Sequence, residues 1–414
     1  MRRRPICLQT IPARLWPGLV VAALGVGCAH LPTCPAKGGP AWNEWTSPHF
    51  RLMTDVTDEA VAEHLATQLE QFRSAILATA WREVPEPTDL LEVIALRSAF
   101  ETEAVLAPRT VAEFAHFGGM NFVLTSATEH IDRAKTLKHE IVHALMHQLG
   151  LDRNAPVWFA EGIAEYLATT ELDDGTNKVT FGSSDPDYLR AVHRLGLASW
   201  DELWAPSAVG MEKCRQVATS WLLVHYLFNH ERERFRRYQA GLATAKNAKS
   251  FWKETFPELG ADGLIDRLSA YSNDGQYVKY VAQMPSPHFG FVQHGIPDAE
   301  VHAILGLLHF SAHFHDDAAR ANARREIGEA LREDPLNVRA RYVERVLLVE
   351  NTRDVSAAEA LTRAHPDDWR SWLVLAVAHA SLRHEAELKA AFTRAGALGL
   401  IDESDLKPAA AAPY

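Results

Sequence analysis

Two histidines four positions apart, with a glutamate directly after the first, constrain this chain more than any other feature. They lie in LKHEIVHALMHQL (residues 137–149), whose apolar spacing predicts a helix that ends at Gly150. Residues four apart share one face of a helix, so His139 and His143 can present two imidazoles to one zinc ion. Glu140 lies about 100° round the helix from His139, where a carboxylate can act as a base beside the metal. The feature predicts a zinc site, and a catalytic site needs a third protein ligand.

The third ligand is sought on the next predicted helix, APVWFAEGIAEYLATTEL (residues 155–172), which begins near Pro156. Glu161 lies there, and a short turn between the two helices would bring it back over the first. Gly162 beside it has little bulk and would allow the helices to approach closely. Glu165 lies one turn further on the same face, and it is either the second-shell partner of a ligating histidine or the rival third ligand. The spacing favours Glu161 as ligand. The alternative is that both segments are ordinary amphipathic helices.

The first residues predict export. MRRRPICLQTIPAR is basic, and LWPGLVVAALGVG (residues 15–27) is an apolar run suited to a secretory signal. The run ends in LGVGC and resembles the lipobox of bacterial lipoproteins, which would make Cys28 a lipidation site and give the chain a membrane anchor. Simple cleavage near Ala29 and an uncleaved N-terminal anchor are the alternatives. We expect a location in the bacterial cell envelope, either as a lipoprotein or in the periplasm, where a Cys34–Cys214 disulfide is possible but not favoured.

Length and charge limit the remaining possibilities. A chain of 414 residues predicts two or three domains, and a net charge of −11 argues against binding to nucleic acid. We expect a signal at 1–28, a Pro- and Gly-rich linker at 29–45, a catalytic domain at 46–180, a helical extension at 181–296 and a helical domain at 297–405.

Patterning within these limits predicts an α+β domain followed by helices. Strands are expected at 47–56, 90–98 and 117–127, and helices at 58–81, 132–149 and 155–172. Beyond residue 297, two helix–turn–helix segments align on Pro335 and Pro366. Their offset of 31 residues is near the ~34 of tetratricopeptide (TPR) repeats, so the region is expected to be TPR-like and to offer a surface for a protein partner. A plain helical bundle is the alternative.

HEIVH followed by WFAEGIAEY resembles the gluzincin metallopeptidases, and SPHFRLMTDV adds a likeness to the peptidase-MA-like group. The resemblance covers about residues 46–230. It implies a zincin-like catalytic domain with a small mixed sheet, zinc held by His139, His143 and Glu161, and Glu140 as general base. Gluzincins often stabilise the oxyanion with a tyrosine or histidine from a later helix. Tyr226 is the first candidate for that role, followed by His225 and Tyr188.

The segment before the first motif bears on the mode of cleavage. FGGMNFVL is expected to be the edge strand along which a polypeptide substrate lies, through Gly119, Met120 and Asn121. Aminopeptidase gluzincins carry a glutamate where this chain has Asn121, which is neutral, so the resemblance implies an endopeptidase. Glu113 or Glu129 could supply the missing carboxylate. The alternatives to a peptidase are an envelope scaffold protein with a non-catalytic zinc site, and a zinc hydrolase acting on a non-peptide bond.

Overall fold

The structure is a computed structural model that describes residues 31–399, apart from 83, 88, 107–109, 129–134, 174–175, 285–288 and 313–316. The predicted signal and Cys28 lie outside the described residues. Within the described part of the chain, no helix combines the length and hydropathy needed to cross a bilayer. The fold is mixed α/β and divides into two compact units. The first unit takes its described residues from Thr67–Thr88 and His130–Phe289, and the second from Ala29–Ala66, Asp89–Glu129 and Gly290–Tyr414.

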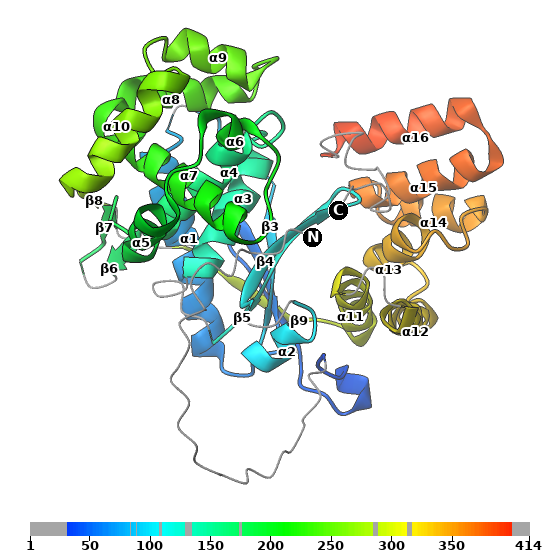
Figure 1. The fold of residues 1–414 in the computed structure, drawn as a ribbon. Coiled ribbons are helices and arrows are strands. Elements are labelled where there is room, and N and C mark those ends of the chain that lie inside the picture. Colours follow the sequence, from blue (N-terminus) through cyan, green and yellow to red (C-terminus); the bar gives the residue numbers. More distant parts are fainter. Residues whose placement is uncertain are drawn as a thin grey trace, which may run out of the picture. The chain divides into compact units, whose positions relative to one another are not determined.

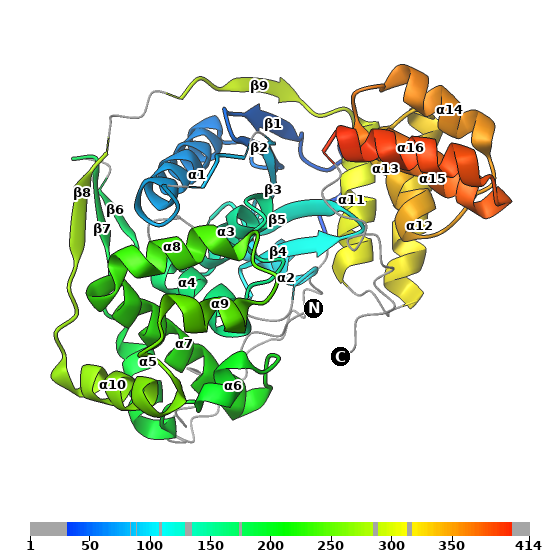
Figure 2. The ribbon, with the colours of Figure 1, turned by 90° about the horizontal axis from the view of Figure 1, so that it is seen from above.

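The second unit is built on a six-stranded mixed sheet (Figure 2). Its strands, in the order in which they pair, are β4 (Ala112–Phe117), β5 (Met120–Ser126), β3 (Leu91–Leu96), β2 (Phe50–Thr54), β1 (Asn43–Thr46) and β9 (Val292–Gly295). The β2–β3 and β3–β5 pairs are parallel and the other three are antiparallel. Strand β3 (LEVIAL) is apolar and almost wholly buried, as expected for a strand in the middle of a sheet. Three helical segments lie between or before these strands in the sequence: η1 (Pro35–Lys37), α1 (Glu59–Thr79) and α2 (Ala99–Glu103). Helix α1 begins in the second unit and continues into the first.

Two predictions about this sheet differ from the structure. The expected linker 29–45 contains the start of β1, and Cys34 and Trp42 within it are almost fully buried, because apolar side chains among the prolines and glycines join the core. Cys34 is a free thiol, so it does not pair with Cys214.

The prediction that FGGMNFVL forms the edge strand of the sheet was also wrong. Gly118 and Gly119, both with positive φ, form a hairpin turn, and β4 on its far side covers the edge of β5. Met120 and Asn121 therefore lie in an interior strand.

The C-terminal part of the second unit is helical (Figure 1). It comprises α11 (Asp298–Ala312), α12 (Asp317–Glu333), α13 (Val338–Tyr342) with a following π-helical turn Val343–Leu347, α14 (Val355–Ala364), α15 (Trp369–Leu382) and α16 (Glu385–Ala397). The two turn prolines occupy matching places. Pro335 precedes α13, whose first turn is capped by Asn337, and Pro366 precedes α15, which is capped by Asp368.

The first unit is mainly helical and holds both motif helices (Figure 1). Its helices are α3 (Lys135–Gln148), α4 (Val157–Ala168), α5 (Pro186–Leu195), α6 (Trp200–Trp204), α7 (Gly210–His230), α8 (Arg232–Leu242), α9 (Ala248–Thr255) and α10 (Ala261–Asp274). A separate antiparallel sheet joins β6 (Glu171–Asp173), β7 (Lys178–Phe181) and β8 (Tyr280–Gln283). The units thus cut across the expected domain boundaries, because the strands of 46–126 belong with the C-terminal helices.

Candidate metal centre

Helix α3 is largely buried, and specific contacts fix where it ends and tie it to α4. Gly150 adopts a positive φ of 65° and its N–H bonds the carbonyl of His147, so the helix stops where the sequence predicts. Lys138 is only 4% exposed, and its ammonium donates to the carbonyl of Thr170 at 2.7 Å, just beyond the end of α4. This bond links α3 to α4.

The structure brings His139, His143 and Glu161 together. Each offers one donor atom, and the three atoms all lie within 4.8 Å of one another. The two Nε2 atoms are 2.9 Å apart, and Nε2 of His139 is 3.9 Å from Oε2 of Glu161. His139 and Glu161 are buried and His143 is half-buried, so the cluster is partly closed to solvent.

Glu165 lies on the other side of the His139 ring. Its Oε1 is 3.0 Å from Nδ1 of His139, while Nε2 of the same ring points into the cluster with His143 and Glu161. A carboxylate accepts hydrogen bonds only, so this placement favours the tautomer of His139 that carries its proton on Nδ1. That tautomer leaves the lone pair on Nε2. Of the two carboxylates, Glu161 therefore lies where it could ligate a metal ion, and Glu165 lies where it could orient His139.

Glu140 and His147 complete the polar positions of α3. Glu140 is 8% exposed and follows His139 directly, so it borders the cluster without joining its donor set. His147 lies eight positions after His139, and its Nδ1 is hydrogen-bonded to Oδ2 of Asp152 at 2.8 Å. It thereby ties the last turn of α3 to the loop that follows.

Gly162 lets α4 approach a different helix from the one expected. A Cβ added there would lie 2.5 Å from the backbone oxygen of Ser220 and 2.9 Å from Val224, both on α7. The glycine therefore sets the distance between α4 and α7, not between α4 and α3. Because α4 carries Glu161 and Glu165, this packing holds both carboxylates in place.

Gly162→Ala should destabilise the protein by about 1–3 kcal/mol, because a backbone oxygen cannot move aside for the new methyl group. Urea unfolding of the full chain measures the change. Gly263→Ala in α10 is the matched control, since its Cβ would meet its nearest neighbour at an ordinary 3.6 Å. Equal effects of the two substitutions would show that α4 and α7 can separate freely.

Tyr226 does not join the cluster. Ser220 and Val224 face α4, and Tyr226 lies about 200° round α7 from Val224. Its hydroxyl accepts from Arg267 at 3.5 Å, and its ring packs on His230 and Tyr271. The assignment to the oxyanion therefore has no support in these contacts. Helix α7 is buried on most of its surface, and a tyrosine in such a helix packs against whichever element covers it, here α10.

The other two candidates for stabilising the oxyanion, His225 and Tyr188, differ in position. His225 is fully buried, with Nδ1 2.8 Å from the Tyr271 hydroxyl and Nε2 3.1 Å from the Gly182 carbonyl. Burial lowers its pKa to about 4, so it is a neutral structural residue. Tyr188 is connected to the surroundings of the cluster, because its ring packs under the ammonium of Lys135, which contacts Glu165.

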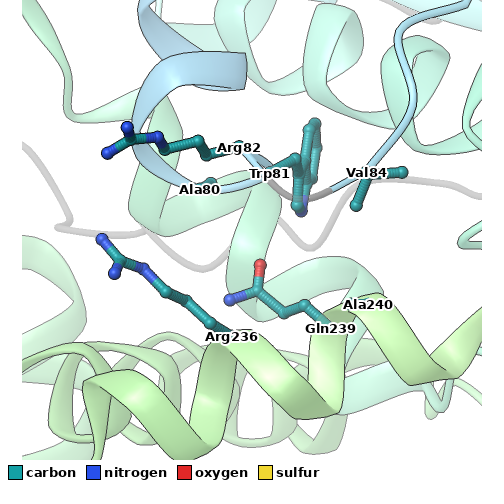
Figure 3. Close-up of a pocket in the computed structure, with 7 residues that line it drawn as sticks. All are labelled: Ala80, Trp81, Arg82, Val84, Arg236, Gln239 and Ala240. Carbon is teal, nitrogen blue, oxygen red and sulfur yellow. The ribbon is translucent and has the colours of Figure 1, made fainter.

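Two cavities in the first unit are separate from the cluster. One is a small chamber of about 10 Å³. Figure 3 shows that Gln239 on α8 points toward Trp81 there. It is lined by Ala80, Trp81, Arg82, Val84, Arg236, Gln239 and Ala240. An open cavity of about 600 Å³ lies beside α7 and α10 and includes Tyr226 and Arg267 in its lining. Neither cavity is lined by a residue of the cluster.

The donor set fits a metal ion of zinc's kind. Two imidazole nitrogens and one carboxylate oxygen are the ligands of many catalytic zinc sites, and a tetrahedral ion would hold its nitrogen ligands about 3.3 Å apart. The observed 2.9 Å between the Nε2 atoms needs only a small opening. A carboxylate behind a ligating histidine is the usual outer partner of such a site, and Glu165 supplies it.

A family model covers this cluster. It is described as a protein of unknown function (DUF1570) and matches residues 133–248. The matched stretch begins two positions before α3 and ends at the first residue of α9, so it contains the three donor residues with Glu140 and Glu165. No curated protein matches the chain.

Sequence reasoning missed two residues beside the cluster, Lys135 and Asp185. The ammonium of Lys135 lies 3.1 Å from Oε2 of Glu165 and also contacts Oδ2 of Asp185. A signal for Lys135 was present, because it precedes His139 by four residues and so shares the face of α3 that carries both histidines. Asp185 lies 20 residues beyond Glu165 at the start of another helix, and no local pattern connects it to the motifs.

Proposed function

We propose that the chain is an exported zinc-dependent metallopeptidase that cleaves within polypeptide chains. The observation that supports this most is the convergence of His139, His143 and Glu161 with Glu165 behind His139. Two imidazoles, a carboxylate ligand and an ordered outer carboxylate are what a catalytic zinc site with one open position requires. The choice of the peptide bond as substrate rests on the resemblance to gluzincins, and the proposal of export rests on the N-terminal sequence.

The roles of the chain's own residues follow from their positions. His139, His143 and Glu161 would hold the metal, and zinc bound there supplies a Lewis acid that makes water more acidic and polarises a carbonyl. Glu140 takes the proton from the attacking water and returns it to the leaving amine. Glu165 keeps the proton of His139 on Nδ1. Burial of Glu140 and Glu161 strengthens the electrostatic interactions of both carboxylates.

Two further parts of the proposal come from the second unit. Asn121, where the resemblance would place a glutamate for the substrate's N-terminus, has a neutral side chain that contacts the His116 ring. Only the resemblance connects this neutrality with endopeptidase action, because Asn121 lies in an interior strand of the second unit. The matching turns at Pro335 and Pro366, each followed by a capped helix, support a TPR-like arrangement of α12–α15 that would bind a protein partner. A scaffold protein with a non-catalytic metal site remains the second function to be tested.

The test begins with the metal content of the purified full chain. We expect one zinc per chain, together with hydrolysis of an unstructured, N-acetylated polypeptide that a chelator stops and added zinc restores. Iron in place of zinc, or stoichiometric zinc without hydrolysis of any peptide, would contradict the proposal. The second result would favour the scaffold.

The two carboxylates of α4 should differ sharply in their effect on zinc. Glu161→Ala removes a ligand and should reduce the zinc content of the purified chain to near zero. Glu165→Ala removes only the partner of Nδ1, so zinc should stay bound with an affinity about 10–100-fold lower. Competition with a chromophoric chelator measures both. Zinc retained by Glu161→Ala but lost from Glu165→Ala would exchange the two roles.

A further inference from the structure

Lys135 is linked to the metal cluster through Glu165. It lies in the first turn of α3, one turn before His139, and its ammonium is 3.1 Å from Oε2 of Glu165. The other oxygen of the same carboxylate, Oε1, is 3.0 Å from Nδ1 of His139. Glu165 therefore uses one oxygen for each partner, and its side chain is only 12% exposed. A continuous chain of charged groups leads from Lys135 to a ligand.

The ammonium of Lys135 is itself held from two further directions. Oδ2 of Asp185 contacts it, while Oδ1 of Asp185 accepts from the backbone N–H groups of Asp187 and Tyr188 and so caps α5. The aromatic ring of Tyr188 lies beneath the ammonium, with the ring centroid 4.1 Å from Nζ. These contacts fix the cation against the start of α5, although the lysine side chain is 37% exposed.

This arrangement has a consequence for the geometry of the site. A carboxylate rotates about its last bond, and loss of the cation would remove a charged contact at Oε2 that resists rotation of Glu165 away from His139. Because Lys135 holds Oε2, Oε1 stays close to Nδ1, and Nε2 keeps the lone pair that a metal needs. Lysine is suited to this task, since its charge is compact and its long stem reaches across one turn of α3.

We propose that Lys135 is a positioning residue of the metal site, which acts on His139 through Glu165. The inference rests on the proposed function only in requiring that the cluster binds zinc, and it is independent of which bond is cleaved. Asp185 and Tyr188 contribute to this positioning indirectly, because they hold the ammonium of Lys135 in place.

The experiment measures zinc affinity of the full chain by chelator competition in wild type, Lys135→Met, Lys135→Arg, Glu165→Gln and the double variant Lys135→Met/Glu165→Gln. Lys135→Met should weaken zinc binding by about 3–10-fold, less than loss of Glu165 itself. Lys135→Arg, which keeps the positive charge, should recover most of the affinity. In the Glu165→Gln background, Lys135→Met should cause no further loss of zinc affinity, because the carboxylate through which Lys135 acts has already been replaced.

Lys249→Met is the matched control. Lys249 lies in the same unit with similar exposure, contacts Asp201 at 3.5 Å and lies over the rings of Trp200 and Trp204, but it is not linked to Glu165. Its replacement should leave zinc affinity unchanged. The visible spectrum of the cobalt-substituted chain gives a second readout, which should change in Lys135→Met and not in Lys249→Met. Lys135→Gln replaces Lys135→Met if the latter does not fold.

Three outcomes would overturn the inference. The first is zinc binding by Lys135→Met as tight as in wild type. The second is a loss of affinity from Lys135→Met that adds fully to the loss from Glu165→Gln. The third is an equal loss of zinc affinity in Lys249→Met. If the wild-type chain binds no zinc at all, the proposed function fails together with this inference. Zinc binding without peptidase activity would leave the role of Lys135 intact.

Discussion

Glu140→Gln should leave zinc fully bound and lower the rate of peptide hydrolysis by about 10²–10⁴-fold, the usual contribution of a general base. The amide has the size of the carboxylate but cannot accept a proton from water. Glu140 is not among the three donor residues, so its replacement should not change the metal content. Metal analysis and the rate of cleavage of an unstructured polypeptide are measured on the same preparation.

His143→Ala is the comparison that separates the two ways of losing activity. It removes a ligand, so activity and zinc should be lost together, whereas Glu140→Gln should lose activity alone. Full activity in Glu140→Gln would mean that another group takes the proton, and the mechanism proposed above would then be wrong. Loss of zinc from Glu140→Gln would place Glu140 among the ligands.

The helices of the candidate site could be predicted because their signals are local. The spacing of His139 and His143 places both on one face, Gly150 ends α3, and α4 begins at Val157, directly after Pro156. Glu161 could be found because the loop between the helices is short and brings α4 back against α3. Each of these inferences uses residues within one helix or on two helices that follow one another along the chain.

The parts that could not be predicted depend on contacts between distant segments. Gly162 packs against Ser220, which lies 58 positions later and carries no sign of the contact. Tyr226 has the chemistry of an oxyanion donor, but the direction of its side chain depends on how α7 rotates against α4 and α10. The burial of Trp42 within a segment rich in proline and glycine likewise depends on β9, which pairs with β1 from 250 positions away.

A buried ionic cluster joins the sheet of the second unit to its C-terminal helices. Arg339 on α13 is 3% exposed and donates to both oxygens of Glu92 on β3, at 2.9 and 3.3 Å. Its Nε also donates to Glu300 on α11 at 2.7 Å. Arg51 and Arg370 approach the same carboxylate at 3.4 and 3.5 Å. Burial alone would raise the pKa of the Glu92 carboxyl, but the positive charges of Arg339 and Arg370 outweigh it and hold that pKa at about 2.

Glu92→Gln should therefore lower the free energy of unfolding by about 3 kcal/mol at pH 7, because it removes the anion that Arg339 and Arg370 share and leaves only Glu300 and Asp368 to balance them. The lowered pKa of Glu92 also determines how this stabilisation changes with pH. The pKa of Glu92 is about 2 in the folded chain and 4.5 ordinarily, so its stabilisation is present above pH 4.5 and is lost as pH falls toward 2. The gap between wild type and Glu92→Gln should close over that range.

Urea unfolding of the full chain at pH 7 and pH 3 measures this, with Glu359→Gln as the matched control. Glu359 pairs with Arg363 at 3.9 Å on the exposed face of α14, so its loss should change stability by less than about 0.5 kcal/mol at either pH. A Glu92→Gln effect as small as that of Glu359→Gln, or one that is equal at pH 7 and pH 3, would mean that the arginines are stabilised by water or by Glu300 instead. A large and acid-sensitive effect would show that β3, α13 and α15 are held together chiefly by one carboxylate, so that the C-terminal helices cannot separate from the sheet without exposing buried charge.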